Sequence, residues 1–194
     1  MTTKAVRVRF AASPAIFGFT RPEREDRRSA EQVAALAWEY FADRLPARET
    51  SPDAVKEWFA RVLDAYLPTV DRLDQLPAAT AFLFGLDVEA ARAEPENAAI
   101  LAADSARMVL AEFANRTRTH KGPVTPEDFK GWMNAIKAAT GVKDAELFDP
   151  VRLALTGAHS GLEFDRLLPL MEVGAALGLG VAGVRERVER FVGV

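Results

Sequence analysis

Signals that begin an α-helix recur along this chain of 194 residues and constrain its fold more than any other feature. Ser51-Pro52-Asp53 and Thr125-Pro126-Glu127-Asp128 each place a hydroxyl before a proline and an acidic residue. A hydroxyl at the N-cap, a proline in the first turn and a negative charge near the positive end of the helix dipole all favour a helix at that point. Apolar residues then recur every three or four positions, which predicts helices with one buried face. These residues are Val55, Trp58, Phe59, Val62, Leu63 and Tyr66 after the first signal, and Phe129, Trp132, Met133 and Ile136 after the second.

Similar patterns run through most of the remaining chain. They predict helices after Ser29, over residues 70–76 and 98–113, from Ser160 to Leu170, and over residues 181–192. Only Val6–Phe10 alternates apolar and charged side chains with a period of two, which predicts a short strand. The sequence therefore predicts an all-α fold of two helical-bundle subdomains with a short N-terminal strand or arm.

Charge and composition suggest where these subdomains divide. The predicted domains are an arm at residues 1–28, a first helical subdomain at 29–115 and a second at 116–194, which begins with the charged segment Arg116–Gly122. The chain up to Asn115 carries a net charge of −4, whereas the part after it carries +1. We therefore expect an anionic partner to bind the later half. The arm carries +4, and either a solvated arm or a contact to RNA fits that charge.

Composition excludes several classes of site. The chain has no cysteine, which excludes disulfides, thiolate nucleophiles and zinc–thiolate sites, and two histidines are too few for most imidazole metal centres. No glycine-rich phosphate loop lies between a strand and a helix, and His159-Ser160 lacks the surroundings of a nucleophile elbow. We therefore expect no enzyme activity, no metal and no cofactor. Without an apolar run that suits a signal peptide or a membrane span, a cytoplasmic protein is expected.

The segment Pro150–Gly157, PVRLALTG, resembles a segment of the helical anticodon-binding domain near the C-terminus of bacterial glutamyl-tRNA synthetases. Leu67–Leu73, Phe82-Leu83-Phe84 and the final glycine-rich turn with its helix resemble the same family in the same order, so the resemblance covers roughly residues 30–194. Val6–Pro14 also resembles the first strand of these enzymes, but the ATP-binding histidine motif does not follow. A doubly wound nucleotide-binding sheet cannot fit in about twenty residues. The resemblance thus implies a truncated relative that lacks the catalytic domain.

The same resemblance implies a non-catalytic module that binds a tRNA anticodon arm. By position, Arg152, Gly161, Leu162 and Phe164 match the family's anticodon contacts, and Thr69 stands where members specific for a glutamate anticodon carry arginine. An arginine can pair with a base edge or phosphate, and single-stranded loops are read by stacking and by splayed base edges. The candidate RNA-binding residues are Arg152, His159, Ser160, Gly161, Leu162 and Phe164, with Arg116, Arg118 and Lys121 in the basic segment.

Two alternatives stay open. Instead of contacting RNA, Arg152 can snorkel with its stem along apolar surface, or it can make an internal ion pair. The chain can also be a protein-interaction or dimerisation scaffold derived from a synthetase, with no RNA bound. An isolated strand at Val6–Phe10 would then pair with a second copy or with another protein.

Overall fold

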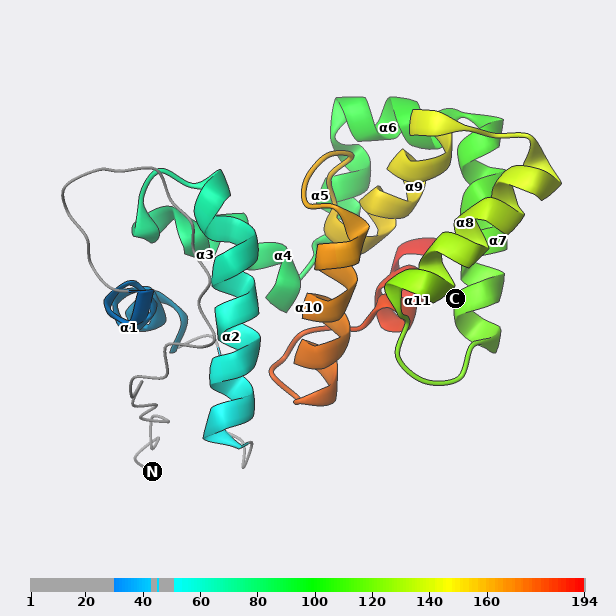
Figure 1. Cartoon of the computed structure of the whole chain (residues 1–194). Helices are drawn as coiled ribbons and strands as arrows, with labels where there is room; N and C mark the ends of the chain where they lie inside the picture. Colours follow the sequence, from blue (N-terminus) through cyan, green and yellow to red (C-terminus); the bar gives the residue numbers. More distant parts are fainter. Residues whose placement is uncertain (1–29, 43–44, 46–50, 194) are drawn as a thin grey trace. The chain divides into compact units, whose positions relative to one another are not determined.

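The structure, a computed structural model, describes residues 30–42, 45 and 51–193 (Figure 1). Throughout these residues the regular structure is helical and no strand occurs, which confirms the all-α prediction for the part described. The predicted arm at 1–28, with its strand at Val6–Phe10, lies outside the described residues. The alternative of a partner bound through that strand therefore stays a prediction.

The chain forms two compact units. Among the described residues, the first comprises those up to Ala81 together with Ala176–Gly180, and the second comprises Phe82–Ala175 and those from Val181 onward. The sequence places its domain boundary between residues 115 and 116 instead, inside a helix that runs on to Thr119. Phe113 and Thr117 on that helix are both buried, so the charged segment continues a packed helix and does not begin as a linker.

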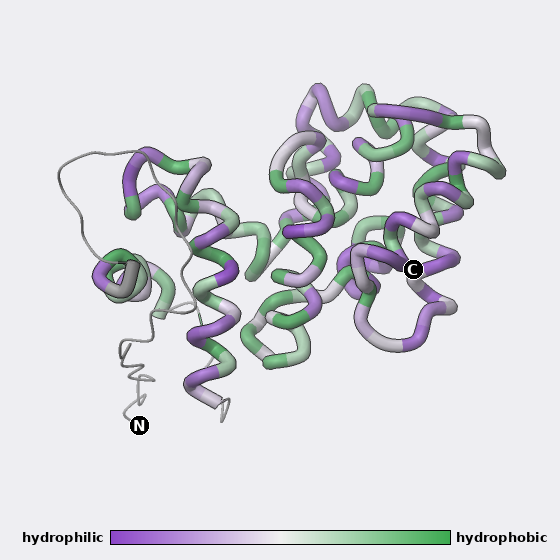
Figure 2. The backbone as a smooth tube through the Cα atoms, viewed as in Figure 1, coloured by the Kyte–Doolittle hydropathy of each residue, from purple (hydrophilic) through white to green (hydrophobic). Residues whose placement is uncertain are grey.

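The first unit contains α1 (Ala30–Phe41), α2 (Pro52–Tyr66), the 3-10 turns η2 (Leu67–Thr69) and η3 (Leu73–Gln75), and α3 (Leu76–Ala79). Helix α2 begins at the predicted proline and ends before Pro68, which cannot supply the next backbone donor. Figure 2 shows hydrophobic and hydrophilic stretches alternating along α2, as expected for one buried face. Its Phe59 packs edge-to-face on Trp38 and Phe41 of α1, with ring centroids 5.1 and 5.0 Å apart. The predicted helix at 70–76 is only the turn η3.

The second unit continues from α4 (Ala81–Phe84) with α5 (Val88–Ala93), α6 (Pro95–Ala102), α7 (Asp104–Thr119), α8 (Pro126–Thr140), α9 (Asp144–Thr156), α10 (Phe164–Ala176) and α11 (Val184–Val192). Helix α7 packs against α8, α9 and α11 (Figure 1). Leu153, Ala154 and Phe191 form a buried cluster that Val88, Ile100, Leu101 and Leu110 extend. The unit therefore has its own apolar core.

Local capping explains the bounds of α8. The hydroxyl of Thr125 accepts from the Asp128 amide at 3.1 Å, and the Asp128 carboxylate accepts from the Thr125 amide at 3.1 Å. This capping box confirms the predicted helix start. Gly141, with φ 74°, ends the helix in the left-handed conformation that glycine adopts without strain.

Two predicted helices have different bounds in the structure. The stretch 98–113 is two helices, because Ala103 is extended with ψ 141° between α6 and α7. The predicted helix from Ser160 begins only at Phe164, so Ser160 is no N-cap. Arg152 donates to the carbonyl of Leu162 and thereby holds the residues before Phe164 in a loop. That helix then continues beyond the predicted end, through Pro169 to Ala176.

Candidate RNA-binding loop and basic segment

The loop between α9 and α10, residues 157–163, contains four of the nine candidate residues, and we call it the 157–163 loop. They are His159, Ser160, Gly161 and Leu162. Gly157 ends α9 with φ 78°, and a Cβ at this position would lie 2.5 Å from Leu86 Cδ1. Glycine is therefore required both by the backbone conformation and by the close packing of the loop. Ser160 and Gly161 are exposed, whereas Leu162 is half-buried. The loop thus exposes small residues, while its first residue, Gly157, is held in place by close packing.

Arg152 points into this loop and not into solvent. The side chain is buried, its Nη1 donates to the carbonyl oxygen of Leu162, and its guanidinium lies 4.2 Å from the centroid of the Phe164 ring. An arginine that points outward beside an accessible turn, as direct RNA contact by Arg152 would require, is therefore not what the structure shows. The side chain is internal, but these contacts are to a carbonyl oxygen and an aromatic ring and not the ion pair of the alternative. A cation over an aromatic face and a charge-assisted hydrogen bond to a carbonyl both stabilise the loop.

Phe164 is covered on both faces of its ring. Phe129 of α8 stacks on it with centroids 4.3 Å apart and an interplanar angle of 29°, and Arg152 lies over it at 4.2 Å. Two groups cannot share one face at these distances, so they must occupy opposite faces. Phe164 itself is 8% exposed. Its ring therefore packs against Arg152 and Phe129 and does not face solvent.

Phe148 is the exposed aromatic ring beside this stack. It lies on α9 one turn before Arg152, is 37% exposed, and has its ring centroid 6.1 Å from that of Phe164. Phe148 is not among the residues predicted from the sequence, although its spacing of four from Arg152 places both on one helix face. An exposed ring next to an arginine is a suitable surface for a nucleic-acid base.

His159 is held by two residues of α6. Its Nδ1 lies 3.4 Å from Asn97 Oδ1, and its Nε2 lies 3.7 Å from Glu96 Oε2. Asn97 is buried and is also missing from the residues predicted from the sequence. No sequence pattern identifies Asn97, because its burial, which requires hydrogen-bond partners for the amide, follows from the packing of separate helices.

The second candidate surface is the segment Arg116–Lys121, which covers the end of α7 and the turn that follows it. Arg116 pairs with Glu112, one turn earlier in the same helix. Arg118 is exposed and donates to Asn115 at 3.2 Å, and Lys121 is also exposed. Arg118 and Lys121 are therefore the cations of this segment that can reach a ligand.

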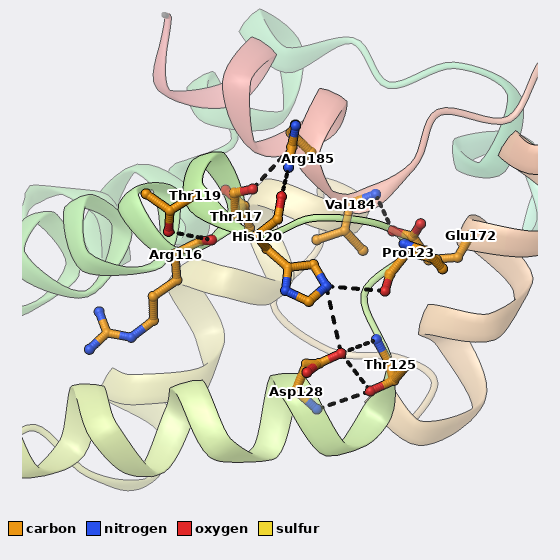
Figure 3. A network of polar contacts seen from close by, with 10 residues as sticks. All are labelled: Arg116, Thr117, Thr119, His120, Pro123, Thr125, Asp128, Glu172, Val184 and Arg185. Atoms are coloured by element: carbon orange, nitrogen blue, oxygen red, sulfur yellow. Dashed lines mark hydrogen bonds and ion pairs between the residues drawn. The ribbon is translucent and has the colours of Figure 1, made fainter.

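Arg185 of α11 adds a cation to this segment, and no sequence pattern predicts it. Its Nε donates to the carbonyl of Thr117 at 3.0 Å and its Nη2 to the carbonyl of His120 (Figure 3). These carbonyls lie at the C-terminal end of α7, where positive charge is stabilised by the helix dipole. The contact fixes the turn that carries Lys121.

His120 links the segment to the start of α8. Its Nε2 lies 3.2 Å from the carbonyl oxygen of Pro123 and 3.7 Å from Asp128 Oδ2 (Figure 3). Its ring packs edge-to-face on Trp132. Hydrogen bonds from the Thr125 side chain and backbone lower the pKa of the Asp128 carboxyl, and the nearby His120 adds to this effect. Since Phe129, the next residue, stacks on Phe164, the first turn of α8 contacts both candidate surfaces.

Charge around these surfaces is balanced and not basic. Residues 116–194 contain eleven arginines and lysines against ten carboxylates, but Arg152 and Arg187 are both buried. The guanidinium of Arg187 donates to four backbone carbonyls, those of Phe82, Leu83, Leu155 and Ala182. The small positive excess of this half is therefore internal, and exposed cations are available only locally.

Two other kinds of site are absent from the described part of the chain. No group of three or more histidine, aspartate or glutamate side chains is placed to hold a metal ion there. No helix in the described ranges is both long and apolar enough to cross a membrane.

Comparison with known proteins identifies relatives along most of the chain. Glutamate–tRNA ligase 2 of Xanthobacter autotrophicus is 32% identical over 185 residues, covering 88% of this chain and 40% of the ligase. Glutamate–tRNA ligase 1 of Caldicellulosiruptor saccharolyticus is 25% identical over 188 residues, covering 94% of this chain and 36% of the ligase. The ligase of Natranaerobius thermophilus is 28% identical over 141 residues, covering 73% of this chain and 28% of the ligase.

The chain thus spans about a third of the length of these relatives. A family described as the anticodon binding domain matches residues 32–178, which include α2, the end of α7 and the 157–163 loop. The resemblance inferred from PVRLALTG is confirmed: the chain is similar to glutamate–tRNA ligases along most of its length, and it belongs to the anticodon binding domain family.

Proposed function

We propose that this chain binds tRNA at the anticodon arm without catalysing aminoacylation. The observation that carries the proposal is the 157–163 loop, which exposes Ser160 and Gly161 while Arg152 holds its end from within. A preformed loop loses little conformational freedom on binding. Membership of the anticodon-binding domain family supports RNA as the ligand.

The chemistry of the loop suits a single-stranded RNA turn. The hydroxyl of Ser160 and the exposed backbone of Ser160-Gly161 can form hydrogen bonds to base edges, 2′-hydroxyls or phosphate oxygens. The exposed ring of Phe148 can stack on an unpaired base. In this proposal Arg152 and Phe164 do not contact the RNA themselves. They pack against each other and stabilise the conformation of the loop.

The basic segment supplies the phosphate contacts in this proposal. Arg118 and Lys121 are exposed, and Arg185 holds the turn that presents Lys121. With balanced charge on the rest of the unit, a few local cations give modest affinity that weakens as salt rises. A tRNA contact of this kind is therefore expected to be strongest at low ionic strength.

The proposal is tested by titrating the chain with tRNA at low and at moderate salt. Arg118→Ala with Lys121→Ala is expected to weaken binding by about tenfold and to reduce the salt dependence by about two phosphate contacts. The matched control is Lys137→Ala with Lys143→Ala, because these exposed lysines lie at the far end of α8 and just after it. Equal losses in the two double variants, or no binding by the wild-type chain at low salt, would overturn the proposal.

A further inference from the structure

Asn97 joins three parts of the second unit through one buried amide. The side chain is 4% exposed, and its Nδ2 donates to the carbonyl oxygens of Ala91 at 2.8 Å and Gly157 at 3.0 Å. A backbone carbonyl only accepts hydrogen bonds, so both contacts require the NH2 end of the amide. The orientation of the Asn97 amide is therefore fixed by α5 on one side and by the 157–163 loop on the other.

This orientation determines which ring nitrogen of His159 carries the proton. The oxygen of the amide, Oδ1, faces Nδ1 of His159 at 3.4 Å. An amide oxygen has no proton to donate, so Nδ1 must be the donor. In the neutral ring Nε2 then carries no proton and has a lone pair. This nitrogen lies 3.7 Å from Glu96 Oε2.

His120, the other histidine of the chain, has the opposite arrangement. Its Nε2 lies 3.2 Å from the carbonyl oxygen of Pro123, which can only accept, so Nε2 is the donor. The chain has only these two histidines. The two rings are thus a matched pair within one molecule, each with a different proton position imposed by its partner.

We infer that Asn97 is a positioning residue of the candidate RNA-binding loop, which holds His159 as the Nδ1–H tautomer so that Nε2 contacts bound RNA. This inference rests on the proposed function for the identity of the ligand. In the neutral ring, Nε2 accepts a hydrogen bond from a base amine or a 2′-hydroxyl. In the protonated ring, Nε2 donates to a phosphate oxygen, and the carboxylate of Glu96 competes for that donor.

The charges near His159 set the direction of this competition. Glu96 is the charged group that faces Nε2, and its side chain is 77% exposed. Arg152 is directed to Leu162, while Asp87, the N-cap of α5, and Arg92 of α5 are engaged with Ala90 and Phe191. The other charged side chains of α5 and α6, of the residue before α6, and of the loop and the residues after it are Glu89, Glu94, Glu96, Glu163, Asp165 and Arg166. Carboxylates predominate, so removing Glu96 favours an RNA phosphate at the protonated ring.

The first experiment reads the tautomers without RNA. Long-range proton–nitrogen correlation spectra of the full chain, at a pH where both rings are neutral, are expected to show Nδ1–H for His159 and Nε2–H for His120. Asn97→Ala removes the acceptor for Nδ1, so His159 is expected to lose the preference. Since the wild-type spectrum is decisive by itself, a variant that fails to fold does not prevent the test. An Nε2–H tautomer at His159 in the wild-type chain would overturn the inference.

The second experiment measures the tRNA affinity of the full chain at low salt. Glu96→Gln is expected to tighten binding about threefold, and His159→Gln is expected to abolish that gain. Glu89→Gln is the control for a general loss of negative charge, and His120→Gln is the control for the second histidine. A gain from Glu96→Gln that persists in the His159→Gln background would overturn the RNA contact of Nε2.

The two experiments separate this inference from the proposed function. If tRNA does not bind at low salt, the proposed function fails and the RNA contact fails with it, while the tautomer spectrum still tests the role of Asn97. If tRNA binds but His159 is the Nε2–H tautomer, only the inference about Asn97 fails.

Discussion

The guanidinium of Arg187 donates to the carbonyl oxygen of Leu155 at 2.9 Å and so ties α11 to the end of α9. The same side chain, which is 2% exposed, also reaches the last residues of α4. It satisfies carbonyls at the ends of two helices, where no further backbone donor follows. Arg187 therefore holds the base from which the 157–163 loop extends.

Replacing Arg187 is expected to destabilise the fold strongly. Arg187→Met keeps much of the volume but leaves buried carbonyls without a donor, which should lower the free energy of unfolding by about 3 kcal/mol. Urea denaturation of the full chain measures this change. Arg190→Met is the control, since Arg190 forms an exposed pair with Glu186 and should change stability by about 0.5 kcal/mol or less. Equal effects of the two substitutions would contradict the role assigned to Arg187.

Two glycines that end helices offer a matched test of packing at the loop. Gly157 and Gly141 have φ values of 78° and 74°, but only at Gly157 would an added Cβ meet neighbouring atoms. Gly141→Ala should cost about 1 kcal/mol from its backbone conformation alone. Gly157→Ala should cost at least about 2 kcal/mol, because Leu86 must also move. Thermal unfolding that ranks the two variants in the opposite order would contradict the close packing at Gly157.

The capping box of α8 is expected to make stability depend on pH in acid. The folded-state pKa of Asp128 is lowered, chiefly by its hydrogen bond from Thr125, so the folded state binds fewer protons than the unfolded state. The stabilisation is therefore complete above the unfolded pKa, about 4, and is lost as the pH falls through the lower folded value. Asp128→Asn should destabilise the chain near neutral pH, and its difference from wild type should shrink below about pH 4. A difference that stays constant across this range of pH would rule out the carboxylate as its cause.

Arg152→Lys distinguishes an indirect role of Arg152 from a direct phosphate contact. Lysine keeps the charge but cannot lie flat over Phe164 as a guanidinium does. If Arg152 shapes the loop, tRNA affinity should fall although the slope of affinity against salt is unchanged. If Arg152 contacts a phosphate directly, Arg152→Lys should instead retain binding. Arg152→Ala should then reduce the slope of affinity against salt by the equivalent of about one phosphate contact. Titrations at three salt concentrations separate these results.

Phe148→Ala tests the exposed ring as a stacking surface. Its loss should weaken tRNA binding by about tenfold, given the usual energy of stacking a base on an aromatic side chain. Because the ring is partly exposed, stability should change little. Met108→Ala, which removes another exposed apolar side chain, from α7, is the control and should leave affinity unchanged. Equal loss in both variants would show that Phe148 has no specific role.

Local chemistry explains why the helices could be predicted from the sequence. Each of the signals that proved correct acts close to the helix end that it defines. These signals are the capping box of Thr125 and Asp128, the proline at position 52 and the glycine at position 141. The start of α10 could not be predicted in the same way. Ser160 and Glu163 have the spacing of a capping box, but Arg152, ten residues before Leu162, holds this segment outside the helix.

The candidate site was only partly predictable for the same physical reason. PVRLALTG indicated the loop after α9 as a candidate, yet the direction of Arg152 depends on Phe164 and Leu162, which no local pattern specifies. Asn97 contacts Gly157 across 60 positions of sequence, and Arg187 contacts Leu83 across 104. Such contacts arise only when separate helices pack together, so neither residue is distinguished by its own neighbours in the sequence.

The most direct test of the account locates the bound RNA on the chain. Amide chemical shifts of the full chain are measured during titration with an anticodon stem-loop RNA at low salt. Shifts are expected to concentrate at Ser160, Gly161 and Lys121, with little change at Lys137 and Lys143. Shifts that are absent at saturating RNA, or that concentrate at the end of α8, would contradict the proposed function.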